Sequence, residues 1–526
     1  MVMRRAHPVE AVRGAERPLI AAAEAAGDPD AVMRRAAAGV AHHTAALLRE
    51  VTGGVYGRSV LLVVGSGDNG GDALYAGAVL RARGCRVEAV LTNPDRAHPR
   101  GVAALRRAGG RIVSAGEVCA TGRRGPDVAV DGVVGLAGTG PLREPAAEVM
   151  ARVHATGVPV VAVDLPSGVD ADSGTVHEPH VQAAVTVTFG VLRRAHLLAS
   201  PVCGRVEVVD IGLSEPPAGP GTVVRPDRAE VGRTWPVPGT GDDKYTQGVV
   251  AVRAGSDRYP GAAVLCASAA VAATSGMVRY VGSAADAVLA ARPEVVCHPT
   301  VSAAGTAQAW VVGPGGGTGN DAVAEIDAVL AEGRPTLLDA DALTCVAAHP
   351  VLLRGATAPV LLTPHAGEFD RLTGGWDRAD RPGALRRFTA GLRDRGIAAT
   401  VLLKGRVTLV DDGETTFAVD VGSSWAATAG SGDVLAGMAG ALLASGMGVG
   451  GTVVGGMDVG GTVVGGRGVG GSVPGESLAW PAVAAATAHG EAARRAAHRQ
   501  GVAGAPIGAS DLLAAVPGAI SALRGA

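Results

Sequence analysis

Short apolar runs recur along the first part of the chain, and each leads into a segment of glycine and polar residues. The apolar positions of residues 30–49 have the spacing of an amphipathic helix, and a second helix is predicted at 72–84. Buried strands that alternate with helices are typical of a parallel sheet covered by helices on both faces. The predicted strands of this part lie at residues 59–65, 87–92, 127–135 and 158–168.

The pattern breaks at residues 212–243, which are rich in proline and glycine and therefore predict a domain junction. After this junction the alternation restarts, so we expect a second domain of the same class. The whole pattern predicts an α/β protein with two domains, at residues 1–222 and 223–526. The predicted strands of the second domain lie at residues 248–255, 309–317, 335–343, 359–368 and 399–410.

Length and composition narrow the class of protein. A chain of 526 residues with 47% apolar residues is long enough for two or three domains, each with its own core. The formal net charge of −2 and the aromatic content of 3% argue against a nucleic-acid partner. We recognise no secretory signal, and the charge-free stretches at 260–278 and 434–457 are too weakly apolar for membrane spans. The six cysteines form no CxxC pair, so no disulfide framework or zinc site is expected, and the cytoplasm is the predicted location.

One segment repeats itself. The stretch VGGTVVGG occurs at residues 449–456 and again at 459–466. Two copies are too few for a solenoid, and the glycine content predicts a flexible surface loop. We therefore expect a glycine-rich insertion at about 446–475, beyond the end of a helix that begins near Asp433.

The candidate chemistry of the first domain lies at the ends of its strands. In open α/β sheets, ligands bind beyond the carboxyl ends of the strands. Oxygen atoms of Asn69, Asp131 and Ser167 could bind a hard cation there, and Asp164 could act as an acid or a base on a substrate. The glycines of the first loop lack the GK[ST] ending of a P-loop, and a structural turn would explain them equally well. The polar loops with acids lie at residues 65–72, 130–140 and 163–170.

A second group of candidates lies in the second domain. Gly430–Gly432 precede Asp433 where a helix is predicted to begin, and the backbone N–H groups of a helix start attract anions. Lys404 ends a strand and could meet a nucleotide phosphate, although a surface lysine would look the same. His365 also lies at a strand end, where a purely structural role is equally open. A glycine loop followed by an acid suits phosphoryl transfer.

Three stretches of the first domain resemble the motifs of the NAD(P)H-hydrate epimerase family: GSGDNGGDALYAG, VDGVVGLAGTGPLREP and AVDLPSGVDADSG. The resemblance covers about residues 15–215 and implies a Rossmann-like, three-layer αβα fold that interconverts the R and S forms of hydrated NADH and NADPH. It also implies Asp164 as a catalytic residue and a potassium ion (K⁺) bound by Asn69, Asp131 and Ser167. The family usually has asparagine where this chain has Asp68. The implied contacts with the hydrate are Asp68, Asn69, Gly70, Gly71, Asp72, Gly135, Leu136, Ala137, Gly138, Thr139, Gly140, Pro141 and Asp164.

Six stretches of the second domain look like the ADP-dependent NAD(P)H-hydrate dehydratases, which have a ribokinase-like, three-layer αβα fold: YPGAAVLCASAAV, VVGPGGGTG, LLDADALT, LLTPHAGEFDRLTG, LLKGRVTLV and AATAGSGDVLAGMAGALLASG. The resemblance implies that phosphate from ADP is placed on the hydroxyl of the S-hydrate and then eliminated, which gives NAD(P)H, AMP and phosphate. Asp433 would activate the hydroxyl, the amides of Gly430–Gly432 would stabilise the phosphoryl group, and Mg²⁺ would accompany the nucleotide. The implied contacts are Ala262, Gly315, His365 and Asp433 for the hydrate, and Lys404, Gly405, Arg406, Val407, Thr408 and Gly432 for the nucleotide.

Together the two resemblances predict a bifunctional metabolite-repair enzyme, expected as a homo-oligomer. Its expected partners are the small molecules NADHX, NADPHX and ADP, with no nucleic acid and no membrane. One alternative is a ribokinase-like kinase of a small alcohol or vitamin precursor, which would accumulate a stable phosphorylated product. Another is that the first domain is a non-catalytic binding module, although Asn69, Asp131 and Asp164 argue against this.

Overall fold

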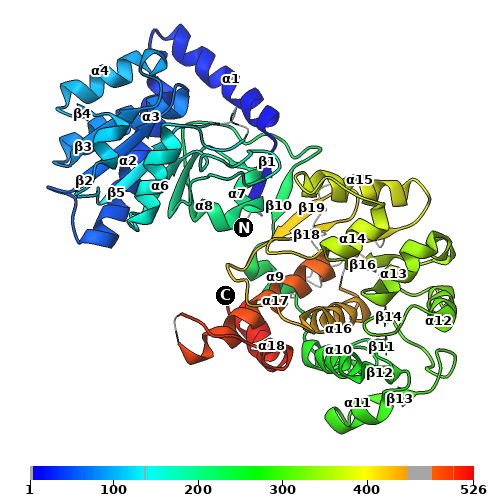
Figure 1. The fold of residues 1–526 in the computed structure, drawn as a ribbon. Helices are drawn as coiled ribbons and strands as arrows, with labels where there is room; N and C mark the ends of the chain where they lie inside the picture. The colour runs from blue at the N-terminus through cyan, green and yellow to red at the C-terminus, as the bar shows by residue number, and fades with distance from the viewer. Residues whose placement is uncertain (1–3, 123, 136–137, 139, 448–476, 502) are drawn as a thin grey trace. The chain divides into compact units, whose positions relative to one another are not determined.

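The structure is a computed structural model that describes residues 4–122, 124–135, 138, 140–447, 477–501 and 503–526. The described chain divides into two compact units, Arg4–Val223 and Val224–Ala526. The glycine-rich repeat at 449–466 lies outside the described residues. Both units alternate strands with helices, so the predicted α/β class is confirmed (Figure 1).

The N-terminal unit is built on a parallel sheet. Its described strands follow the order β4-β3-β2-β5-β6-β7-β9. The chain runs outward from β2 to β4 and then returns to β5 beside β2, so a switch point lies between β2 and β5. Ligands bind at such a point in open sheets. The strands are β2 (Ser59–Val64), β3 (Arg86–Leu91), β4 (Arg111–Ile112), β5 (Val128–Gly132), β6 (Val160–Val163), β7 (Val185–Phe189) and β9 (Arg205–Val209). Outside this sheet, β1 (Arg4–His7) pairs in parallel with β8 (Leu192–Arg193).

Helices cover both faces of this sheet and create two apolar cores. Side chains of α2 (Ala31–Thr52) and α3 (Asp68–Ala82) form one core, and side chains of α6 (Ala146–Ala155) contribute to the other. Helix α3 begins before residue 72, where its start was predicted, because packing against β2 and β5 outweighs the poor helix propensity of its first glycines. The remaining helical elements are α1 (Val9–Ala25), η1 (Pro94–Arg96), α4 (Pro99–Arg107), α5 (Ala115–Cys119), α7 (Arg194–Leu198) and α8 (Ser200–Cys203).

The C-terminal unit holds a second sheet, with the described order β13-β12-β11-β14-β15-β16-β17-β18-β19. The predicted strand at 399–410 is two strands, β17 and β18, which pair antiparallel through a turn at Lys404–Val407. This edge of the sheet is therefore antiparallel, since β19 is also antiparallel to β18. The strands are β11 (Val249–Arg253), β12 (Met277–Val281), β13 (Val296–His298), β14 (Ala309–Val312), β15 (Thr336–Leu338), β16 (Val360–Leu362), β17 (Ala399–Leu403), β18 (Thr408–Asp411) and β19 (Thr416–Val419).

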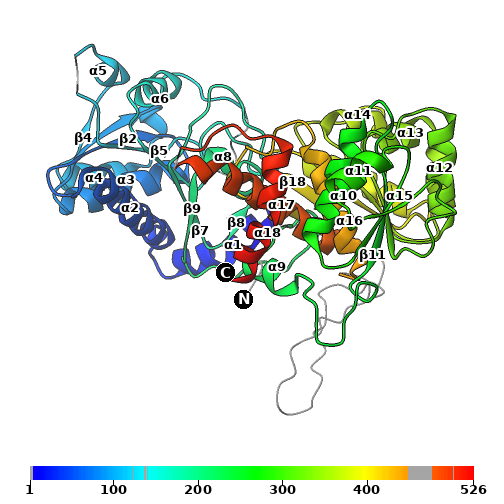
Figure 2. The same ribbon diagram turned by 90° about the horizontal axis from the view of Figure 1, so that it is seen from below.

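Two sets of helices enclose this sheet (Figures 1 and 2). Helices α10 (Pro260–Ala273), α16 (Ser431–Ala444) and α17 (Ala479–Ala497) lie on one face and form a continuous apolar core with it. The predicted junction at 212–243 contains β10 (Val223–Arg225) and α9 (Arg228–Thr234). The remaining helical elements are α11 (Ala285–Ala291), α12 (Asn320–Ala331), α13 (Asp341–Ala348), η2 (Pro350–Gly355), α14 (Ala366–Thr373), α15 (Arg381–Arg393), η3 (His498–Gln500) and α18 (Ala509–Arg524).

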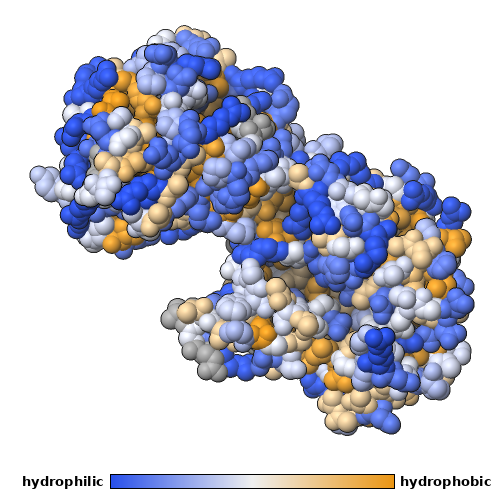
Figure 3. Space-filling view, viewed as in Figure 1, coloured by the Kyte–Doolittle hydropathy of each residue, from blue (hydrophilic) through white to orange (hydrophobic). Residues whose placement is uncertain are grey.

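The surface seen in Figure 3 is largely hydrophilic, with apolar residues in small patches. Within the described residues, no helix combines the length and the apolar content needed to cross a membrane.

Close packing of α10 on α16 predicts a large effect of a small substitution. A methyl group added in Gly437→Ala would lie 2.1 Å from the carbonyl oxygen of Cys266, so the two helices must move apart. We expect Gly437→Ala to lower the free energy of unfolding by about 1–3 kcal/mol. All five tryptophans lie in the C-terminal unit, so tryptophan fluorescence during urea unfolding reports on this unit alone.

Gly391→Ala on α15 is the matched control, because nothing lies within 4 Å of the added methyl group. This control should stabilise the unit by up to about 1 kcal/mol through higher helix propensity. Equal stability of the two variants would show that the α10–α16 contact does not need glycine.

Candidate active sites in the two units

A cavity of about 680 Å³ opens at the carboxyl ends of the strands in the N-terminal unit. The structure brings several of the residues predicted from the sequence together in its wall. These residues are Asp68, Asn69, Asp72, Gly135 and Asp164. Gly70, Gly71, Gly138, Gly140 and Pro141 are not among the lining residues, and Leu136, Ala137 and Thr139 lie outside the described residues.

Asp164 lines this cavity and directly follows β6. It is buried, and its backbone has φ 63°, a left-handed conformation that is uncommon for a residue other than glycine. Its Oδ1 atom accepts a hydrogen bond of 2.8 Å from the Thr188 hydroxyl and lies 3.2 Å from Nη2 of Arg193. The strained backbone is therefore fixed by contacts from β7 and β8, which aim the carboxyl group in one direction.

His196 and Arg193 complete the surroundings of Asp164, and the sequence did not single them out. Nδ1 of His196 accepts from the Arg193 backbone N–H at 2.9 Å, so Nε2 carries the proton and donates to the Asp164 carbonyl at 2.7 Å. Burial lowers the pKa of His196 to about 4, which keeps the ring neutral. The available signal was the cluster of basic residues in the otherwise apolar stretch GVLRRAHLLAS.

Asn69, Asp131 and Ser167 lie together beside this cavity. Asp131 Oδ1 accepts from the Ser167 hydroxyl and Oδ2 accepts from the Ser167 N–H, both at 2.8 Å. Nδ2 of Asn69 donates hydrogen bonds to the carbonyls of Val134 and Val163. The other amide atom of Asn69, Oδ1, therefore points away from these two carbonyls. Burial raises the pKa of Asp131 to about 6, although the hydrogen bonds from Ser167 lower it. The group offers only oxygen ligands, which suits a hard cation.

Asp72 is another acid in the wall of the cavity. Burial raises its pKa well above the usual range, and the nearby charges of Asp164, Asp68 and Glu16 act in the same direction. Within the described residues its Oδ1 is buried without a hydrogen-bond partner. A buried oxygen of this kind is suited to bind a polar group of a ligand.

The second site lies at the beginning of α16 in the C-terminal unit. Gly430 precedes the helix with φ 80°, and Asp433 lies in the first turn. Lys404, at the end of β17, has its Nζ atom 2.7 Å from Asp339 Oδ1 and 3.6 Å from Glu368 Oε2. A Cβ atom on Gly432 would lie 3.6 Å from the same Nζ atom. The structure therefore brings Gly430–Gly432, Asp433 and Lys404 together, as an anion site requires.

Asp433 has the electrostatic properties of a base that works near neutral pH. Burial raises its pKa, the charge of Asp339 raises it further and Lys404 lowers it, and the result is a pKa of about 7. Burial also lowers the pKa of Lys404, but Asp339 and Glu368 outweigh burial and raise it. A base with a pKa near the working pH is well matched to proton transfer.

Asp339 and Glu368 are partners that the sequence interpretation missed. Asp339 follows β15 in the stretch LLDADALT, and Glu368 lies in the first turn of α14. Both positions follow an apolar run at the carboxyl end of a strand, which was the available signal. Ala340, next to Asp339, has φ 51°, so the backbone is strained here as it is at Asp164.

His489, on α17, is a further contact that could not be predicted. Its Nε2 atom lies 2.9 Å from the carbonyl oxygen and 3.1 Å from the hydroxyl oxygen of Ser431. Burial lowers the pKa of His489 to about 4, so the ring is neutral. This contact fixes the first residue of α16 and with it the orientation of the neighbouring amides.

Ala262, Gly315 and His365 were predicted to contact the hydrate. A Cβ atom on Gly315 would lie 2.9 Å from the Cβ of Ala262, so these two positions are neighbours. His365 caps α14, because its Nδ1 accepts from the N–H of Gly367 at 3.0 Å and Glu368 Oε2 accepts from the His365 N–H at 2.7 Å. Its side chain is 55% exposed, so a role as a buried core histidine is ruled out.

The segment predicted to bind the nucleotide forms the turn between β17 and β18. Arg406 forms an ion pair with Asp420, and the carbonyl of Val407 accepts a hydrogen bond of 3.2 Å from Arg381. The Thr408 hydroxyl donates to the Gly405 carbonyl at 3.2 Å. Lys404 is the residue of this segment that points toward Asp339 and Glu368.

Both halves of the chain match known protein families. The NAD(P)H-hydrate dehydratase family matches residues 250–514, and the family described as YjeF-related protein N-terminus matches residues 29–195. The bifunctional NAD(P)H-hydrate repair enzyme Nnr of Mycobacterium tuberculosis is 53% identical over 447 residues, which are 85% of this chain and 90% of the relative. The chain belongs to the family of bifunctional NAD(P)H-hydrate repair enzymes.

Two further matches have lower identity. The Nnr enzyme of Corynebacterium glutamicum is 36% identical over 514 residues, with 84% of this chain and 87% of the relative covered. A crystal structure of the ADP/ATP-dependent NAD(P)H-hydrate dehydratase from Bacillus subtilis, co-crystallised with ATP and Mg²⁺, matches 56% of this chain and 97% of its own. That match has 21% identity and a TM-score of 0.43.

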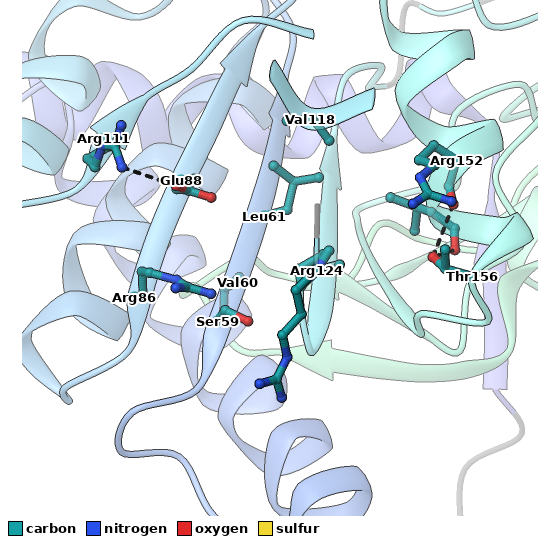
Figure 4. A pocket seen from close by; sticks show the side chains of 13 residues that line it. Ser59, Val60, Leu61, Arg86, Glu88, Arg111, Val118, Arg124, Arg152 and Thr156 are labelled. Atoms are coloured by element: carbon teal, nitrogen blue, oxygen red, sulfur yellow. Dashed lines mark hydrogen bonds and ion pairs between the residues drawn. The ribbon is translucent and has the colours of Figure 1, made fainter. Parts of the chain in front are cut away.

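A second cavity of the N-terminal unit, of about 340 Å³, contains none of the residues predicted for the family's sites (Figure 4). It lies at the amino ends of the strands, where Ser59 begins β2 and Arg86 begins β3. Arg111 in its wall lies 3.6 Å from Glu88. Its position, at the edge of the sheet opposite Asp164, separates it from the family's candidate site.

Proposed function

We propose that the chain repairs hydrated NADH and NADPH in two steps, one in each unit. The N-terminal unit, assigned to residues 1–222, interconverts the R- and S-hydrates. The C-terminal unit, assigned to residues 223–526, dehydrates the S-hydrate with ADP and gives NAD(P)H, AMP and phosphate. The observation that supports this most directly is that each family match contains its own site built around one acid, the buried Asp164 or the half-buried Asp433.

In the N-terminal unit, Asp164 would transfer a proton to or from the hydroxyl group of the hydrate. Thr188 and Arg193 hold its Oδ1 atom, and no hydrogen bond from the described residues reaches its Oδ2, so that oxygen can serve the substrate. Asp72, Asn69 and Gly135 would contact the hydrate from the cavity wall. Asn69, Asp131 and Ser167 would hold K⁺, which would supply a fixed positive charge beside the polar groups of the substrate.

In the C-terminal unit, Asp433 would take the proton from the hydroxyl of the S-hydrate as that oxygen attacks the terminal phosphoryl group of ADP. The amides of Gly430–Gly432 would bind the phosphoryl oxygens, and the charge of Lys404 lies beside them. Phosphate is a good leaving group, so it departs and a proton is lost from the neighbouring carbon as the ring double bond returns. Ala262, Gly315 and His365 would hold the hydrate, and Gly405, Arg406, Val407 and Thr408 would hold the nucleotide.

Mg²⁺ would accompany ADP and neutralise part of its phosphate charge. Within the described residues, no three acids, histidines or cysteines gather to hold a metal ion. This agrees with the usual behaviour of Mg²⁺, which keeps several waters and binds through phosphates and one or two carboxylates.

A kinase that retains its phosphorylated product is not favoured, because the family that matches the C-terminal half is described as a dehydratase. A non-catalytic N-terminal module is not favoured either, because full-length relatives are bifunctional enzymes. The cytoplasmic location and the homo-oligomer stay predictions from the sequence.

Asp433→Asn should abolish dehydration and leave epimerisation intact. A general base typically contributes about 10²- to 10⁴-fold, so the rate with pure S-hydrate and ADP should fall by about that factor. The absorbance of regenerated NADH measures dehydration, and chromatography of the R- and S-hydrates measures epimerisation. Near-normal dehydration by this variant would overturn the assignment of Asp433.

Asp164→Asn should abolish epimerisation and leave dehydration intact. When R-hydrate is the starting material, the variant should regenerate NADH no faster than spontaneous epimerisation allows, because its carboxyl group can no longer transfer a proton. S-hydrate should be consumed at the parent rate, which controls for folding of the C-terminal unit. Rapid consumption of R-hydrate would show that another group carries out epimerisation.

The pH dependence of dehydration should follow the protonation of Asp433. Its pKa is about 7 and only the carboxylate can accept a proton, so kcat should fall as the pH drops below about 7. Asp339→Asn removes a like charge that raises this pKa. The fall in kcat at low pH, which is the acid limb of the profile, should therefore move to lower pH. Asp394→Asn, an exposed site on the same unit, is the control and should leave the limb in place. A limb that stays near pH 7 in Asp339→Asn would contradict this account.

A further inference from the structure

Glu16 approaches the epimerase site from helix α1. Its Oε1 atom lies 3.2 Å from Nη2 of Arg193, the same nitrogen that lies 3.2 Å from Asp164 Oδ1. The two carboxyl groups therefore share one guanidinium nitrogen and must be close neighbours. Both also line the 680 Å³ cavity.

The shared guanidinium is rigidly held. Arg193 is 1% exposed, and its Nη1 atom donates to the carbonyls of Phe189 at 3.2 Å and Val191 at 2.8 Å. Because Nη1 is anchored by the backbone, Nη2 has a fixed position between the two carboxyl groups. The arrangement fixes Glu16 relative to Asp164 although the two residues come from distant parts of the sequence.

Glu16 also differs from an ordinary surface glutamate. Its side chain is 22% exposed, and burial raises its pKa, with Arg193 opposing this and Asp164 and Asp68 adding to it. A larger fraction of this side chain is therefore protonated at a given pH than for an exposed glutamate, while its exposed part can exchange protons with solvent. The charged groups that face it are Arg13 and Arg17 on its own helix, Asp68 and Asp72 on α3, Asp164 after β6 and Arg193 on β8.

We propose that Glu16 is the second proton-transfer residue of epimerisation and acts as the general acid while Asp164 acts as the base. This inference rests on the proposed epimerase function of the N-terminal unit. A pair of acids suits the reaction because epimerisation must remove a hydroxyl group and add it again on the other face of the ring.

The reaction begins from a hydrate whose hydroxyl group lies on the ring carbon next to the ring nitrogen. Glu16 protonates the hydroxyl, the C–O bond breaks as water departs with the bonding electrons, and the nitrogen lone pair forms a C=N bond. Water then adds to the opposite face, the C=N electron pair returns to nitrogen, and Asp164 takes the proton from the new hydroxyl group. The forward reaction leaves Glu16 deprotonated and Asp164 protonated. The reverse reaction then uses Asp164 as the acid and Glu16 as the base. Proton exchange with solvent also returns the two residues to their starting protonation states.

Glu16→Gln in the full-length chain tests this proposal. We expect kcat for conversion of R- to S-hydrate to fall by at least about 100-fold, with KM within about threefold of the parent, because the amide keeps its size but cannot donate an acid proton. Glu50→Gln is the matched control, since Glu50 lies on α2 with a side chain 48% exposed and pairs with Arg205, and neither residue lines the cavity. Its epimerisation should equal that of the parent.

The pH profile distinguishes a proton donor from a residue that only positions Arg193. A general acid must be protonated, so the parent rate should fall as the pH rises through the pKa of Glu16, and Glu16→Gln should lack this alkaline limb. Glu16→Asp, which keeps a proton, should be slower than the parent but retain the limb. Epimerisation by Glu16→Gln within about threefold of the parent, or a limb that persists in it, would overturn the proposal. Failure of the parent chain to epimerise would instead overturn the proposed function.

Discussion

A cation at the carboxyl edge of each sheet, buried in one unit and half-buried in the other, holds the acids of that site together. In the N-terminal unit, Arg193 is 1% exposed and contacts Asp164 and Glu16. In the C-terminal unit, Lys404 is 20% exposed and contacts Asp339 and Glu368. A buried charge without a partner is very costly, so the cation and the acids of each site stabilise one another. The acids in turn stabilise the charge of the cation, and the fold brings them together from separate parts of the chain.

The sheets meet that requirement because their parallel strands point the same way, so the loops that follow those strands meet at one edge although they are far apart in the sequence. This is why Asp164, Asp433 and Lys404 could be found from the sequence, since each directly follows an apolar run or opens a helix. Their partners were missed for a physical reason. Arg193, Glu16 and His489 lie within helices or short strands, and only long-range packing brings them to the site.

Local rules also failed where packing outweighed propensity. The glycines of α3 were predicted as a loop, yet the helix begins at Asp68 because the sheet supports its first turn. The single run at 399–410 gave no sign of a reversal in direction, because a tight turn at Lys404–Val407 needs only a few residues between two apolar segments. In both cases the deviation positions a candidate site residue: Asn69 lies beside Val163, and Lys404 lies at the end of β17.

Burial and the opposing cation have complementary effects on the protons of the two sites. Burial raises the pKa values of Glu16, Asp72 and Asp433, whereas Arg193 lowers that of Glu16 and Lys404 lowers that of Asp433. Burial alone favours the neutral form of these acids, and exposure to water favours the charged form. The balance places Asp433 at about 7, where it can both accept and release a proton. The cations therefore do more than hold the acids in place, because Arg193 and Lys404 also oppose the rise in pKa that burial causes at Glu16 and Asp433.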